Sequence, residues 1–108
     1  MTDRKLLELA AKAAGLKLSF YDGVHRNATG ADPAMNICAF PVWNPLNDDG
    51  DALRLAVKLK IDTLHRREVW ATTAGKGLQL SEAFDEDPCA ATRLAITRAA
   101  AEIGRAMP

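Results

Sequence analysis

The chain has 108 residues, a length typical of one domain rather than of a two-domain enzyme. Its 14 Lys and Arg residues balance 14 Asp and Glu residues, so the overall charge indicates neither a nucleic-acid nor an anionic membrane partner. A hydrophobic share of 48% is enough for one core, and no apolar run is long enough for a membrane-spanning helix.

The N-terminal sequence and the cysteines favour a cytoplasmic protein. Charged residues open the chain without an uninterrupted apolar run behind them, which differs from a secretory signal peptide. Cys38 and Cys89 lie outside any metal-binding or redox spacing. Both stand in apolar patterns, so we expect buried, reduced thiols that fill the core.

The first predicted element is an amphipathic helix. Its apolar residues recur at the helical spacing i, i+3, i+4 and i+7: Leu6, Leu9, Ala10 and Ala13. Thr2 or Asp3 can cap its start, and Gly15 ends it.

A hairpin of two strands is expected next. Residues 16–21 alternate between apolar and polar side chains, the period of a half-buried strand. Residues 22–36 are rich in Asn, Gly, Asp and Pro and predict a long loop. The simplest interpretation is a tolerated insertion, and the alternatives are a mobile loop or one that carries a partner contact. Residues 37–40 predict a second strand that pairs with the first and ends at Pro41.

The second helix is predicted from residue 52 to residue 59, after a turn-rich stretch over 41–51. Its inward stripe follows the helical spacing: Ala52, Leu55, Ala56 and Leu59. Leu53 and Val57 widen this stripe, which predicts a central helix covered on more than one side.

The remaining elements are a group of strands and a last helix. Residues 61–65 and 68–72 predict two strands, residues 75–77 a turn, and residues 78–80 a third strand. The last helix is predicted over 88–103. Asp87 caps it, Pro88 takes its first position, and Gly104 ends it.

These elements predict an α+β domain over residues 1–108. The strands come in adjacent pairs with short connections, which favours an antiparallel sheet. We expect three to five strands and three helices in the order α-β-β-α-β-β-(β)-α.

Three aspartates at the start of the second helix suggest a metal site: Asp48, Asp49 and Asp51. An EF-hand alignment fails, because it places Pro45 and Ala56 at ligand positions. Helix capping explains the carboxylates better. We assign no catalytic, cofactor-binding or metal-binding residue, and a metal-dependent enzyme stays the third alternative.

The second alternative is nucleic-acid binding through Arg66, Arg67 and Trp70, since basic residues near an aromatic ring can hold a single strand. Acidic residues such as Asp62 and Glu68 interleave with them. A solvated surface is the simpler interpretation.

The leading interpretation is protein binding through the turn-rich stretch. Trp43, flanked by prolines, either plugs the core or anchors an interface, and the plug is the default. We predict a contact region made of the 22–36 loop and five residues of the turn: Trp43, Asn44, Asn47, Asp48 and Asp49.

Three motifs carry a resemblance to a known family. They are the run Trp43-Asn44-Pro45-Leu46, the helix start Asp51-Ala52, and Asp87-Pro88 before an alanine-rich helix. With these motifs, the chain resembles the NinX-like family of small proteins from tailed phages and prophages, whose function is unknown. The resemblance implies an accessory protein in the cytoplasm of a bacterial host, and it assigns no catalytic residue. Together with the small size and the lack of a catalytic constellation, it leads us to expect a protein that binds a host or phage protein.

Overall fold

The computed structural model describes residues 2–32, 34–73, 79–83 and 86–108. In chain order the elements are α1 (Asp3–Ala14), β1 (Leu18–Tyr21), β2 (Val24–Asn27), the 3-10 helix η1 (Ile37–Ala39), α2 (Asp49–Leu59), β3 (Ile61–His65), β4 (Glu68–Thr73), β5 (Gln79–Ala83) and α3 (Pro88–Arg105). The strands form two antiparallel sheets, β1-β2 and β3-β4-β5. The predicted α+β class and the order of its elements are confirmed.

Polar side chains at the N-termini fix where the helices begin. Thr2 accepts a hydrogen bond from the Lys5 amide. The Asp48 side chain accepts from the Asp51 amide at the start of α2, and the Asp87 side chain accepts from the Ala90 amide at the start of α3. Each cap satisfies an amide that has no partner within the helix, and Gly15 ends α1 in the left-handed conformation. The predicted caps are therefore confirmed.

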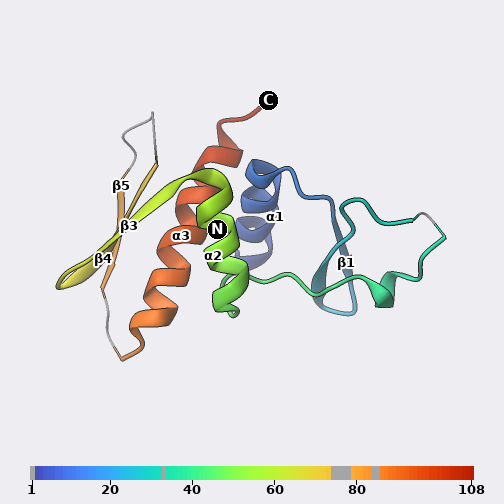
Figure 1. Cartoon of the computed structure of the whole chain (residues 1–108), viewed down its shortest axis with the longest axis horizontal. Helices are drawn as coiled ribbons and strands as arrows, with labels where there is room; N and C mark the ends of the chain where they lie inside the picture. Colours follow the sequence, from blue (N-terminus) through green and yellow to red (C-terminus); the bar gives the residue numbers. More distant parts are fainter. Residues whose placement is uncertain (1, 33, 74–78, 84–85) are drawn as a thin grey trace.

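Helix α1 packs along α3 through small side chains (Figure 1). Ala10 in α1 and Ala99 and Ala100 in α3 have no exposed surface. A Cβ atom built on Gly104 would stand 2.0 Å from the carbonyl oxygen of Leu9. This close contact explains why Gly104 lies inside α3, which continues to Arg105, whereas the sequence predicted that Gly104 ends the helix.

The three-stranded sheet covers the side of α3 that faces away from α1 (Figure 1). Strand β4 is its central strand, and Val69, Ala71 and Thr73 are its buried residues. The alternate residues of β4 are half-buried, as expected for a sheet with a helix on one face. The sheet ends at β3 on one side, so no strand among the described residues lies beyond β3.

The β1-β2 hairpin and the chain around η1 extend from the helices on the side opposite the three-stranded sheet (Figure 1). Asp22 and Gly23 have φ angles of 53° and 80°, which permit a two-residue turn between the strands. The amide of Trp43 donates to the carbonyl of His25, which ties this hairpin to the segment before α2.

Residues 37–40 do not form the predicted second strand. They form η1, where the Asn36 side chain accepts a hydrogen bond from the Cys38 amide and starts a helical turn. Strand β2 takes the predicted place beside β1, because the 22–23 turn reverses the chain at once. Part of the predicted 22–36 loop is therefore strand.

The prediction of buried cysteines is wrong, because Cys38 and Cys89 are both exposed. Cys38 lies in η1, and Cys89 lies in the first turn of α3. The predicted turn over residues 75–77 lies outside the described residues. No helix in the described part of the chain combines the length and the apolar character needed to cross a membrane.

Candidate partner-binding groove

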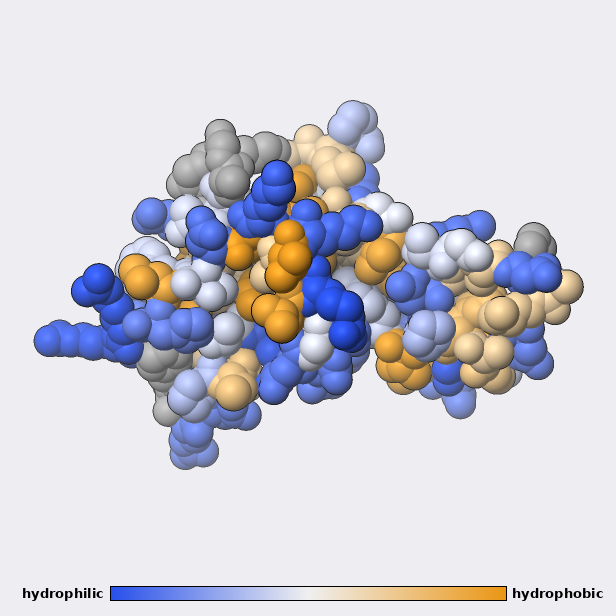
Figure 2. Space-filling model, viewed as in Figure 1, coloured by the Kyte–Doolittle hydropathy of each residue, from blue (hydrophilic) through white to orange (hydrophobic). Residues whose placement is uncertain are grey.

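A groove of about 690 Å³ lies between α2, β3 and the start of α3. Its apolar lining comes from all three elements: Ala52, Leu53, Ala56, Val57, Ile61 and Ile96. Figure 2 shows hydrophobic side chains exposed in a patch over α2, with hydrophilic residues around them. A concave apolar surface with a polar rim is typical of binding sites.

Leu53 and Val57 form the outer wall of the groove. Their exposed fractions are 64% and 69%, whereas Leu55 on the opposite side of α2 is 3% exposed. The two side chains are four positions apart and therefore lie on one row of the helix. The prediction that α2 is covered on more than one side is wrong, because the sheet ends at β3 and does not extend beside this row.

An ion pair closes one end of the groove. Arg93 donates through Nη1 to Asp49 Oδ1 at 2.6 Å and through Nε to the carbonyl of Leu46 at 2.8 Å. These bonds hold the start of α2 against α3. Lys60, which follows α2, stands at the rim near β3.

His65 joins β3 to α3 within the groove lining. Its Nε2 atom lies 3.2 Å from Thr92 Oγ1, while that hydroxyl donates its proton to the carbonyl of Pro88. A hydroxyl has one proton to give, so Thr92 accepts at this contact and His65 Nε2 carries the hydrogen. The predicted position of His65 at an exposed strand end is confirmed.

Trp43 and Asn44, two of the five residues predicted to contact a partner, have structural roles. Trp43 is 6% exposed and belongs to the core, as the default interpretation predicts. The side-chain oxygen of Asn44 accepts a hydrogen bond from the backbone amide of Leu46, and the backbone amide of Asn44 donates to the Asp51 carboxylate. These contacts shape the turn that leads into α2.

The other three residues lie at the surface. Asp48 caps α2, Asn47 is exposed, and Asp49 lies at the rim of the groove. The structure therefore brings Asp49 to the candidate site. Leu53 and Val57 were not predicted as site residues, although their place outside the main helical stripe was the available signal.

The three aspartates at the start of α2 all bind groups of the protein, and Arg54 lies near both Asp48 and Asp51. Asp48 accepts from the Asp51 amide, Asp49 from Arg93, and Asp51 from Arg54 at 2.7 Å. Asp51 is also the acceptor for the Asn44 amide. Among residues 2–32, 34–73, 79–83 and 86–108, no three His, Cys, Asp or Glu side chains are placed to hold a metal ion.

Arg66 and Arg67 stand at the tip of the β3-β4 hairpin, and both are exposed. Trp70 in β4 is half-buried and lies between Leu64 in β3 and Ser81 in β5. By strand alternation it faces away from α3, on the same side of the sheet as Asp62 and Glu68. Acidic and basic groups therefore share the surface around Trp70.

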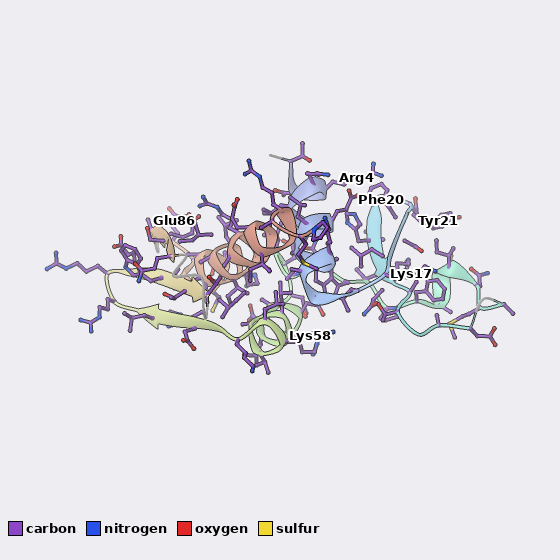
Figure 3. All side chains as sticks on the ribbon, turned by 90° about the horizontal axis from the view of Figure 1, so that it is seen from above. Arg4, Lys17, Phe20, Tyr21, Lys58 and Glu86 are labelled. Carbon is purple, nitrogen blue, oxygen red and sulfur yellow. The ribbon has the colours of Figure 1, made fainter. Side chains whose placement is uncertain are left out.

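A second polar cluster holds the β1-β2 hairpin to α1. The buried His25 places Nε2 3.2 Å from Glu8 Oε2, and this hydrogen bond lowers the pKa of Glu8 below its ordinary value of 4.5. The Arg4 guanidinium stacks 3.9 Å from the centre of the Phe20 ring, and Figure 3 shows these two residues together. These hydrogen bonds and the ring contact hold the hairpin against α1, so the cluster has a structural role.

Comparison of the chain with models of protein families, with curated proteins and with solved structures finds no match.

Proposed function

We propose that this protein acts by binding another protein, whose apolar side chains enter the groove between α2, β3 and α3. The observation that supports the proposal is the exposure of Leu53 and Val57 beside a groove of about 690 Å³. Covering such side chains removes apolar surface from water, which is the main favourable contribution in most protein associations. The charged rim formed by Asp49, Arg93 and Lys60 would orient the partner.

We further propose the biological setting that the family resemblance implies. The Trp43-Asn44-Pro45-Leu46 run and the Asp87-Pro88 helix start resemble phage-encoded proteins. In this proposal the protein is an accessory factor in the cytoplasm of a bacterial host, and its partner is a host or phage protein.

A comparative capture experiment tests the groove. Immobilised wild-type protein and the double variant Leu53→Glu/Val57→Glu are exposed to lysate of the host, and captured proteins are identified by mass spectrometry. The matched control is Val42→Glu, because Val42 is 51% exposed and is not among the residues that line the groove. We expect the double variant to lose proteins that the wild type and the control both retain.

A photoreactive amino acid placed at position 57 or at position 42 refines the result. Cross-linking of the captured protein from position 57 and not from position 42 would support the groove. Identical capture by all three proteins, or cross-linking from position 42 alone, would reject it.

Nucleic-acid binding is the second candidate, because Trp70 and the arginines of the hairpin tip are close in the sheet. A labelled single-stranded oligonucleotide at low ionic strength tests it, since phosphate contacts are strongest there. Binding that Arg66→Ser/Arg67→Ser abolishes would favour this candidate. The acidic residues on the same surface lead us to expect no binding.

A further inference from the structure

Strand β3 ends the three-stranded sheet, and its solvent-facing residues have an unusual order. Asp62 and Leu64 in β3 and Arg66, the first residue after it, follow at alternate positions, so they lie on the face of the sheet away from α3. Leu64 is 51% exposed. When a second copy of this strand runs antiparallel to the first, the acidic residue of each copy faces the basic residue of the other. The two apolar residues then face each other.

The backbone of β3 also presents bonding groups to the open edge. The Arg66 amide donates to the Glu68 carbonyl at 3.0 Å, so these residues form a hydrogen-bonded pair of the hairpin. Hydrogen-bonded pairs alternate along an antiparallel ladder, which assigns the next ones to Leu64–Trp70 and Asp62–Thr72. The amide and carbonyl of Thr63 therefore point away from β4.

We propose that two copies of the chain pair through β3, antiparallel, with Leu64 opposite Leu64 of the second copy. A two-fold axis between two strands requires antiparallel pairing. In this register Asp62 lies opposite Arg66 of the second copy, and the symmetry repeats the contact. Opposite charges at facing positions of neighbouring strands stabilise pairing, so each dimer gains two such pairs around a central apolar contact.

Charge distinguishes this register from its neighbours. Centring the pair on Thr63 brings Lys60 toward Arg66 of the second copy and leaves Asp62 opposite a leucine. Centring it on Asp62 places two carboxylates face to face. Like charges opposite each other destabilise a sheet, and the register centred on Leu64 avoids both arrangements.

The charged groups needed for this contact are available within the described part of the chain. Ion pairs occupy five arginines, Arg4, Arg54, Arg93, Arg98 and Arg105. Neither Asp62 nor Arg66 forms an ion pair in the described residues. Pairing two copies satisfies both groups and covers Leu64.

Charge reversal tests the pairing. Sedimentation velocity over a concentration series gives the dissociation constant of the wild-type dimer. Asp62→Arg places arginines opposite one another, and Arg66→Asp places aspartates opposite one another, so each single variant should weaken the dimer about tenfold or more. An equimolar mixture of the two variants should associate as well as the wild type, because every facing pair then joins an aspartate with an arginine.

A disulfide tests the register. In a background of Cys38→Ser/Cys89→Ser, Leu64→Cys should cross-link two copies on oxidation, because facing residues of a non-hydrogen-bonded pair have Cα atoms about 4.5 Å apart. Asp62→Cys is the matched control and should cross-link far less. All substituted residues are exposed, so the variants should keep the fold.

Each result has a defined meaning. A wild type that stays monomeric at its highest soluble concentration overturns the pairing, as does a mixture of the two charge variants that fails to associate. Stronger cross-linking at position 62 than at position 64 overturns the register. Asp62, Thr63 and His65 of β3 also line the groove. The mixture of charge variants and the position-64 disulfide nevertheless report on two copies of this chain alone, so their failure is distinguishable from a failure of the groove to capture another protein.

Discussion

Gly104 shows how one missing side chain sets the distance between two helices. Its position would put a Cβ atom 2.0 Å from the Leu9 carbonyl oxygen, so any larger residue pushes α1 and α3 apart. Helix propensity alone favours alanine over glycine by about 1 kcal/mol. We expect the steric cost to exceed this gain, and Gly104→Ala to lower the free energy of unfolding by about 1–3 kcal/mol.

Urea denaturation measures this difference. Arg105→Ala is the control, because it changes the next residue at an exposed position and should stay within about 0.5 kcal/mol of the wild type. A Gly104→Ala variant more stable than the wild type would show that the two helices can separate at little cost.

Glu8 links the stability of the fold to pH. Its pKa is lowered from 4.5, first by the hydrogen bond with His25, so the unfolded chain binds this proton more tightly than the folded protein does. A carboxyl group of this kind stabilises the fold fully above its unfolded pKa. The contribution is lost as the pH falls through the lower pKa of the folded state.

We therefore expect acid to destabilise the wild type more than Glu8→Gln. Urea midpoints of unfolding are measured between about pH 6 and about pH 3. The wild type should have the higher midpoint at about pH 6, and the midpoints of the two proteins should converge at about pH 3. Glu86→Gln changes an exposed carboxyl group, and its urea midpoint should depend on pH in the same way as that of the wild type. Parallel curves for Glu8→Gln and the wild type would contradict the assignment.

At the scale of the elements, α2 has two apolar sides with different surroundings. Leu55 is 3% exposed and Val57 is 69% exposed, although both belong to the apolar pattern of the helix. Leu55→Ala should lower the free energy of unfolding by about 2–5 kcal/mol. Val57→Ser should lower it by less than about 0.5 kcal/mol.

Urea denaturation of both variants checks this prediction, with each variant serving as the control for the other. Equal losses would mean that Val57 is covered in the folded protein. The measurement is made on the purified protein at a concentration where it is monomeric, so that no second molecule contributes to the free energy of unfolding.

The sequence predicted the helices well because local groups decide where they begin. Asp48 and Asp87 cap their helices through the amides three residues later, which is visible in the order of residues alone. The partner of β1 was harder, because two segments after Phe20 could form a strand. The choice depends on the left-handed conformation of Asp22, which side-chain alternation does not reveal.

At the scale of the whole molecule, the candidate site depends on which sides of the elements remain uncovered. Periodicity places Leu53 and Val57 beside one another on α2, but it does not state where the sheet ends. The described sheet stops at β3, and this long-range arrangement leaves both side chains exposed. Asp49 alone among the predicted contact residues reaches the groove lining, because the neighbouring residues bind within the turn.

The pairing of α1 with α3 constrains how the chain folds as it is made. Residues 15–87, about two thirds of the chain, separate the two helices, and α1 buries its alanines largely against α3. During synthesis α1 leaves the ribosome long before its partner exists, so this contact closes a long loop and forms late. Until then α1 exposes its apolar side to water, where chaperones or other nascent chains can reach it.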